Sequence, residues 1–76
     1  MERRQRISEL CLGGDWAARR GDTASLAEIA EELAARVHEP LHCRLVEVAS
    51  LCRAHPEQAT AAWTNIKEQV LLSPDP

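Results

Sequence analysis

The chain has 76 residues with twelve acidic and nine basic side chains, a formal net charge of −3, and no Phe or Tyr. This length allows one domain at most, and the acidic balance argues against a dedicated nucleic-acid binder, which usually carries a clearly basic surface. Trp16 and Trp63 are its two large aromatic residues, so a core must come mainly from Leu, Ile, Val and Ala. A domain this small buries only about 60% of the surface of its unfolded chain. We therefore expect a thin stability margin that a partner or self-association would improve.

The cysteines and the first residues bear on the cellular compartment. Cys11, Cys43 and Cys52 are an odd number without a C-x-x-C pair, whereas a secreted disulfide-stabilised domain would carry an even number at higher density. The basic start, residues 1–6, is followed by a segment that polar residues interrupt, unlike the apolar part of a secretory signal. No apolar run reaches the length of a membrane span. We therefore expect a cytoplasmic protein with reduced thiols and no membrane partner.

The first predicted helix covers residues 4–20. Its apolar residues have the spacing of one helix face: Ile7, Leu10, Cys11, Gly14, Ala17 and Ala18. The adjacent glycines, Gly13 and Gly14, cost about 2 kcal/mol relative to two alanines in a helix. Two outcomes are open, because the helix either bends at these glycines or continues through them.

A continuous first helix would carry a second apolar group away from this face. Leu12 and Trp16 would project almost opposite the apolar stripe, with Glu9 and Arg20 beside them. Tryptophan is over-represented among the residues that dominate binding energy, so these four residues are the candidate partner-binding surface. If the helix breaks at the glycines instead, Trp16 turns inward and completes the core.

The second predicted helix covers residues 23–37 and has the clearest periodicity. Ser25 and Glu28 have the spacing of a capping box, while Asp22 and Thr23 are alternative N-caps. The apolar residues recur at intervals of three and four and form one face: Leu26, Ile29, Ala30, Leu33 and Val37.

Two further helices are predicted over residues 40–53 and 56–71. Pro40 and Pro56 suit the first turn of these helices, where the missing N–H would have no partner in any case. The tail at residues 73–76 stops the last helix and is expected to fray. The apolar faces are Leu41, Leu45, Val48 and Cys52 in the third helix, and Ala59, Ala62, Trp63, Ile66 and Val70 in the fourth.

These four helices predict an all-α fold. Loops of two to four residues would force consecutive helices to pack antiparallel. We therefore expect a single domain over residues 1–76, built as two helical hairpins in a small bundle or a repeat-like pair. The predicted core consists of Leu10, Leu26, Ile29, Leu33, Val37, Leu41, Leu45, Val48, Trp63, Ile66 and Val70.

The two halves of the chain match each other at an offset of about 33 residues. The matched positions include Leu26 with Ala59, Ala30 with Trp63, and Leu33 with Ile66. With Gly14 at the small position of its first helix and Gly21 at its turn, the chain resembles tetratricopeptide-type repeats over residues 10–74. It departs from the pattern at Ala17, where an aromatic is expected, and at Glu47, where a small residue is expected. The resemblance implies a helical-repeat adaptor or small chaperone that binds a peptide or helix.

Cysteines and histidines are the candidate groups for catalysis or metal binding. Cys52 and His55 are three residues apart and can touch on a helix, but Cys52 lies on an apolar stripe, where a thiol behaves as a small hydrophobic group. His38, His42 and His55 are able to gather at one end of the domain, yet with Cys43 they meet none of the standard zinc spacings. We therefore predict no catalytic residue, no enzyme activity, no cofactor and no bound metal.

Residues 25–33 are also typical of the first helix of a helix-turn-helix, with residues 41–53 as the recognition helix. The tight glycine-containing turn after Leu33 is missing, and the would-be recognition helix carries only Arg44 and Arg53 as basic residues. Nucleic-acid binding is therefore disfavoured, since it rests mainly on neutralising phosphates. The sequence favours a non-enzymatic interaction module, an adaptor or chaperone-like subunit that binds another protein or self-associates. A helix-turn-helix regulator that binds DNA is the alternative.

Overall fold

The computed structural model describes residues 7–72, and every regular element in this range is an α-helix. The prediction of an all-α fold with four helices is therefore confirmed. Residues 4–6, where the first predicted helix would begin, and the tail at 73–76 lie outside the described residues. The helices are α1 (Ile7–Arg20), α2 (Thr23–Ala34), α3 (Leu41–Ala54) and α4 (Pro56–Leu72).

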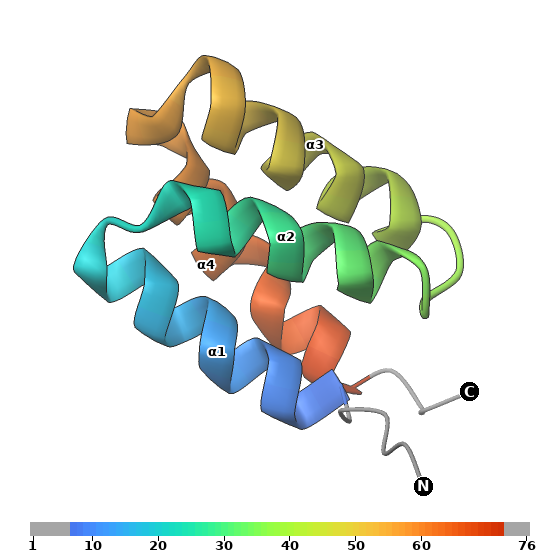
Figure 1. Ribbon diagram of the computed structural model, residues 1–76. Helices are drawn as coiled ribbons and strands as arrows, with labels where there is room; N and C mark the ends of the chain where they lie inside the picture. Colours follow the sequence, from blue (N-terminus) through green and yellow to red (C-terminus); the bar gives the residue numbers. More distant parts are fainter. Residues whose placement is uncertain (1–6, 73–76) are drawn as a thin grey trace, which may run out of the picture.

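The helices form a closed ring. Consecutive helices pack antiparallel: α1, α2 and α3 lie beside one another, and α4 crosses behind them (Figure 1). The last helix also packs against the first, so that α1 has α2 on one side and α4 on the other. The described part of the chain begins and ends at the same end of the molecule (Figure 1). This closure matters for the outer surface of α1, because two neighbours determine which side of that helix faces solvent.

The turn between α1 and α2 is built from two residues. Gly21 has a positive φ of 71°, a conformation that glycine adopts without steric cost. Asp22 is the N-cap of α2: its carboxylate accepts the backbone N–H of Ser25 at 3.2 Å and the Ser25 hydroxyl at 2.8 Å. Of the alternative caps that the sequence offered, Asp22 is therefore the one used, and Ser25 lies inside the helix.

The end of α2 differs from the prediction, because the helix stops at Ala34 instead of residue 37. The backbone tightens after Ala34, where Arg36 N–H donates to the Leu33 carbonyl at 2.9 Å. His42, from the start of α3, donates through Nδ1 to the Ala34 carbonyl oxygen at 2.6 Å and so satisfies a carbonyl at the helix end.

The loop between α2 and α3 covers residues 35–40 and is longer than the predicted two to four residues. A proline disfavours helical geometry in the residue before it, so Pro40 explains why the helix does not run on into α3. Val37 is nevertheless buried from within this loop. The other predicted boundaries agree with the structure to within one residue, apart from the undescribed start of α1.

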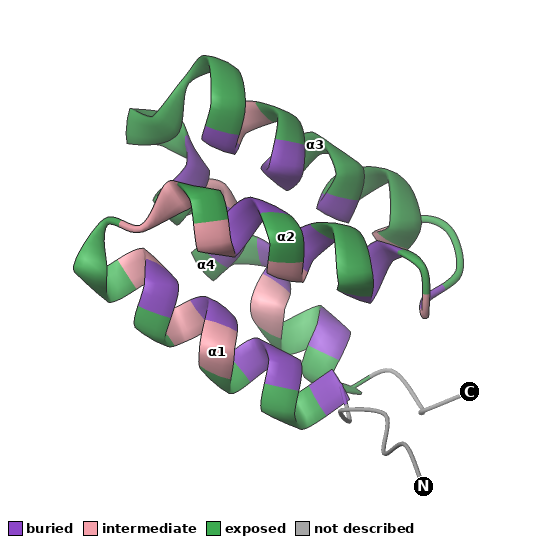
Figure 2. Cartoon of the chain, in the orientation of Figure 1, coloured by how far each residue is buried: buried purple, intermediate pink, exposed green. Residues whose placement is uncertain are grey.

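Apolar residues from all four helices fill the centre of the ring (Figure 2). The predicted core residues are buried except for Ile29 and Leu41, which are half-buried and pack against its edge. Leu41 is the first residue of α3, and Ile29 lies on the side of α2 that meets Gly13 of α1. The buried set also contains residues outside the predicted core: Ile7, Cys11, Ala17, Ala27, Ala30, Ala34, Ala49, Cys52 and Ala59.

Candidate functional site

The outer surface of α1 carries two large apolar side chains. Leu12 is 63% exposed and Trp16 is 64% exposed, and their spacing of four residues places them on the same side of the helix. Glu9 and Arg20 are exposed as well. The helix runs through its two glycines without interruption, so Trp16 faces solvent and does not complete the core. Of the two outcomes left open by the sequence, the continuous helix is the one observed.

The opposite side of α1 meets α4 at a close approach. A Cβ atom placed on Gly14 would lie 2.5 Å from Cζ2 of Trp63, a distance that real Cβ contacts essentially never show. Trp63 itself is fully buried. Gly14 therefore allows the indole ring to lie directly on the backbone of α1, which brings the two helices together.

A polar contact fixes this approach. The Oδ1 atom of Asp15 accepts hydrogen bonds from Nε1 of Trp63 at 2.9 Å and from Nζ of Lys67 at 3.0 Å. Burial by itself would raise the pKa of Asp15, but the hydrogen bonds from Trp63 and Lys67 outweigh it and lower the pKa below its ordinary value of 3.8. The carboxylate is therefore held in its charged form against α4.

These contacts set the rotation of α1 about its own axis. Gly14 lies against Trp63, and Asp15 bonds to the same ring from the flank of α1, so Leu12 and Trp16, which lie opposite Gly14, point to solvent. Sequence reasoning did not identify Asp15 or Lys67, since the bonds they form join positions 48 and 52 residues apart. Helical periodicity describes neighbours within one helix and carries no signal for such pairs.

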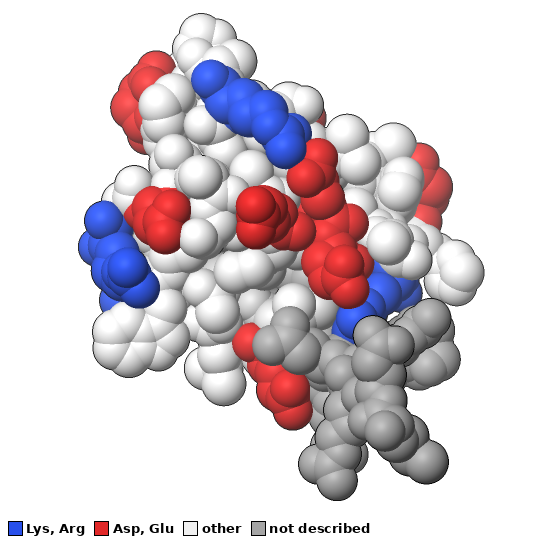
Figure 3. Space-filling model, in the orientation of Figure 1, with Lys and Arg blue, Asp and Glu red and all other residues white. Residues whose placement is uncertain are grey.

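Charged residues are arranged in order along the α1 edge of the molecule. Figure 3 shows basic side chains near the turn between α1 and α2, an uncharged stretch beside them, and acidic side chains toward the start of α1. The basic group corresponds to Arg19 and Arg20 in the last turn, and Glu9 is the acidic residue of the first turn. The exposed apolar pair therefore lies between charges of opposite sign.

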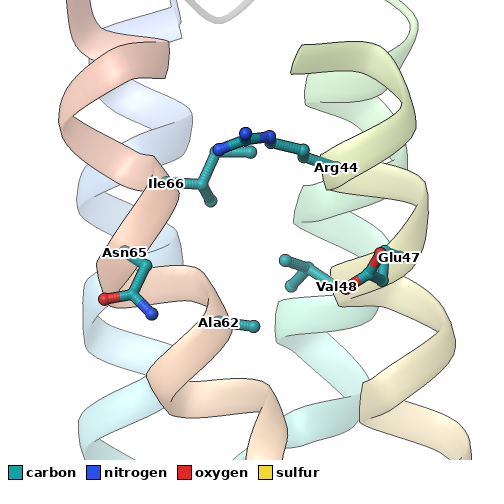
Figure 4. A pocket seen from close by; sticks show the side chains of 6 residues that line it. All are labelled: Arg44, Glu47, Val48, Ala62, Asn65 and Ile66. Atoms are coloured by element: carbon teal, nitrogen blue, oxygen red, sulfur yellow. The ribbon is translucent and has the colours of Figure 1, made fainter. Parts of the chain in front are cut away.

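A second surface feature is an open groove of about 370 Å³ between α3 and α4. Val48 and Ala62 face each other across it, and the side chain of Arg44 extends from α3 toward Ile66 on α4 (Figure 4). Glu47 completes the charged part of its rim. The groove offers a shallow apolar floor between polar groups, and sequence reasoning did not identify it because its two sides come from different helices.

The thiols are not arranged for nucleophilic chemistry. Cys11 is buried, and burial together with the charge of Asp15 raises its pKa to about 11. Burial also raises the pKa of Cys52, as expected for a residue of the apolar stripe. Cys43 is exposed, but its thiol donates a hydrogen bond to Glu39 at 2.7 Å, and this bond raises its pKa. Each of these thiols is therefore held in its protonated, less reactive form at neutral pH.

The histidines have separate surroundings. His42 contacts the end of α2, whereas Nδ1 of His55 lies 3.6 Å from a carboxylate oxygen of Glu57. His38 is exposed in the loop before α3. Within residues 7–72, no three His, Cys, Asp or Glu side chains lie close enough together to hold a metal ion.

In α3, which would be the recognition helix in the helix-turn-helix alternative, one of the two arginines forms an ion pair within the domain. Arg53 forms an ion pair with Glu31 of α2 at 3.1 Å, while Arg44 lies at the groove with Glu47 beside it. The six-residue connection at 35–40 replaces the tight turn that the helix-turn-helix alternative requires. These surroundings do not favour the DNA-binding alternative.

Comparisons with protein-family models, curated proteins and solved structures found no match to this chain. Within residues 7–72, none of the helices has the length and apolar character that a membrane crossing requires.

Proposed function

We propose that this protein is a non-enzymatic interaction module whose binding surface is the outer side of α1. The observation that carries the proposal is the exposed pair formed by Leu12 and Trp16, each about two-thirds accessible to solvent. Single exposed apolar residues are common on soluble proteins, but an adjacent Trp and Leu on one helix face form a patch. Trp is the residue type most typical of energetic centres in interfaces.

The support for α1 is suited to this role. A binding helix that is already ordered loses less conformational entropy on association than a flexible segment does. The hydrogen bonds from Trp63 and Lys67 to Asp15 hold α1 on the domain before any partner arrives. Glu9 and Arg20, at the ends of the patch, supply charges that orient a partner.

The proposed role is that of a small cytoplasmic adaptor or chaperone-like subunit that binds another protein or a copy of itself. The resemblance of the two hairpins to tetratricopeptide-type repeats supports an adaptor. No group in the outer side of α1 is chemically reactive, so the proposal assigns it binding without catalysis.

Photo-crosslinking in the native cells tests the proposal. A photoreactive amino acid at Leu12 should form a covalent adduct with a protein that mass spectrometry identifies. The same amino acid at Ser50, an exposed position on α3, is the matched control and should form none. Adding the substitution Trp16→Ala should remove the adduct at position 12. If a folded protein with the probe at position 12 forms no adduct, the proposed binding surface is wrong.

A further inference from the structure

The four residues of the outer surface are placed symmetrically along α1. The midpoint between Leu12 and Trp16 is position 14, and the midpoint between Glu9 and Arg20 lies half a residue further along. At about 1.5 Å of rise per residue, the two midpoints differ by less than about 1 Å along the helix axis. In an interface with two-fold symmetry, residue i of one copy contacts residue j of the other, and residue j of the first contacts residue i of the second. In an antiparallel pair of helices, all such residue pairs must therefore share one midpoint, which lies at the symmetry axis.

The positions around the helix agree with this symmetry. At about 100° per residue, Glu9 and Arg20 lie about 20° apart around α1, and both lie on the same flank of the Leu12–Trp16 pair. When two helices pack antiparallel about a two-fold axis, residues on equivalent flanks face each other across the interface. Glu9 would then face Arg20 of a second copy at one end of the patch, and Arg20 would face Glu9 at the other.

Both charges are available for such a contact. Within residues 7–72, neither Glu9 nor Arg20 takes part in a side-chain hydrogen bond or an ion pair. The hydrogen bonds from Ser25 lower the pKa of Asp22 below its ordinary value, and the charge of Arg20 contributes to this lowering. The ion pairs that the structure shows in this range lie elsewhere, including those between Arg53 and Glu31 and between Lys67 and Asp15. A surface with two charges of the same sign in these places would repel its own copy, whereas opposite signs complement it.

We infer that the partner of this surface is a second copy of the chain, packed antiparallel against the outer side of α1 about a two-fold axis at the level of position 14. This inference rests on the proposed function and names the occupant of the same surface. In the dimer, Leu12 of each copy packs on Trp16 of the other, and an ion pair between Glu9 and Arg20 closes each end. One helix face is a small interface, below the size of about 1,000 Å² typical of stable complexes. An interface of this size is typical of weak, transient association, so the dimer should dissociate on dilution.

Charge exchange tests the register of this dimer, with sedimentation velocity over a wide range of protein concentration as the measurement. Glu9→Arg and Arg20→Glu should each weaken self-association by about tenfold or more, because both end pairs become repulsive. Mixing these two variants should restore association as a heterodimer, since each end then joins Arg to Glu. The double variant should dimerise as the natural chain does.

Arg19→Glu is the matched control for this experiment. It makes the same change of charge in the adjacent position of α1, but Arg19 lies on the opposite flank of the apolar pair, about 100° around the helix from Arg20. Its effect on association should be clearly smaller than that of Arg20→Glu. Circular dichroism should show that every variant keeps its helical content.

Three results would overturn the inference. The inference is wrong if the natural chain sediments as a monomer at every concentration, or if the mixed variants associate no better than each variant alone. It is also wrong if Arg19→Glu weakens association as much as Arg20→Glu. These results are distinct from a failure of the proposed function. If the photoreactive group at position 12 attaches to a different protein while the chain remains monomeric, the binding surface is correct and the second copy is wrong.

Discussion

The two sides of α1 use the same kind of residue in opposite ways. On the inner side, Trp63 of α4 lies on Gly14 with no exposed surface, and its indole N–H is bonded to Asp15. On the outer side, Trp16 is 64% exposed, with Leu12 as its apolar neighbour. The comparison shows that a buried Trp needs both a space for its ring and an acceptor for its N–H. The inner side supplies both, and by fixing the helix it presents the outer side to solvent.

The largest effect in this comparison is expected for Trp63→Ala. Loss of a buried Trp side chain costs about 3–5 kcal/mol, and this substitution also removes one of the two donors to Asp15. Since small domains are stable by only about 5–15 kcal/mol, this loss is a large fraction of the total, and the urea midpoint followed by circular dichroism should fall sharply. Trp63→Phe keeps a ring but loses the N–H, so its stability should lie between that of the natural chain and that of Trp63→Ala. A Trp63→Ala protein with the natural midpoint would show that the α1–α4 contact does not stabilise the fold.

The next largest effect is expected at the adjacent glycines. Gly14→Ala places a methyl group 2.5 Å from the Trp63 ring, so it should destabilise the domain by about 1–3 kcal/mol despite the better helix propensity of alanine. Gly13→Ala is the matched control, because its methyl group would lie 3.3 Å from the flexible end of Ile29. There the gain in propensity of about 1 kcal/mol should offset the small displacement. Equal changes in the two urea midpoints would contradict the close approach at Gly14.

Sequence periodicity predicted the helices because burial on one face repeats every three to four residues. Leu26 and Leu33 of α2 are fully buried, as this pattern requires. The pattern failed at Val37, which is buried in a loop after the helix has ended. An apolar residue at helical spacing shows that a position is buried, but it does not show that the backbone there is helical.

Contacts between distant segments were beyond sequence reasoning. The sequence marks Gly14 as a point where the helix could bend and, in the repeat resemblance, as the small position of its first helix, but it does not identify Trp63 as the side chain that packs there. The hydrogen bonds that Asp15 accepts from Trp63 and Lys67 join α1 to α4, and no pattern within either helix indicates them. The exposure of Leu12 and Trp16 was predicted from their positions around a helix, on the condition that the helix is unbroken. The helix α1 is continuous, and both side chains are exposed.

A smaller effect is expected from protonation of Asp15. The folded protein lowers the pKa of this carboxyl below 3.8, so its contribution to stability is fully present above the unfolded pKa and is lost as the pH falls through the folded pKa. Asp15→Asn removes the ion pair with Lys67 and should cost about 1 kcal/mol or less at neutral pH. The difference in unfolding free energy between the two proteins should shrink below about pH 4. Glu31→Gln, which removes the exposed ion pair with Arg53, is the control. Its unfolding free energy should differ less from that of the natural chain than the unfolding free energy of Asp15→Asn does. A difference for Asp15→Asn that stays constant from neutral to acid pH would contradict the assigned role.

The smallest effect on the fold is expected for Trp16→Ala, and it separates the two sides of α1 most directly. Surface substitutions away from special contacts change stability by about 0.5 kcal/mol or less, so in dilute solution the variant and the natural chain should unfold at the same urea concentration. In concentrated solution the natural chain gains stability by mass action if it self-associates, because only the folded state binds. The variant lacks the central contact and should not share this gain, so the two midpoints should separate as concentration rises. If Trp16→Ala is instead destabilised by several kcal/mol in solutions where the natural chain is monomeric, then Trp16 supports the fold of its own domain, and the outer side of α1 has no exposed aromatic side chain to offer a partner.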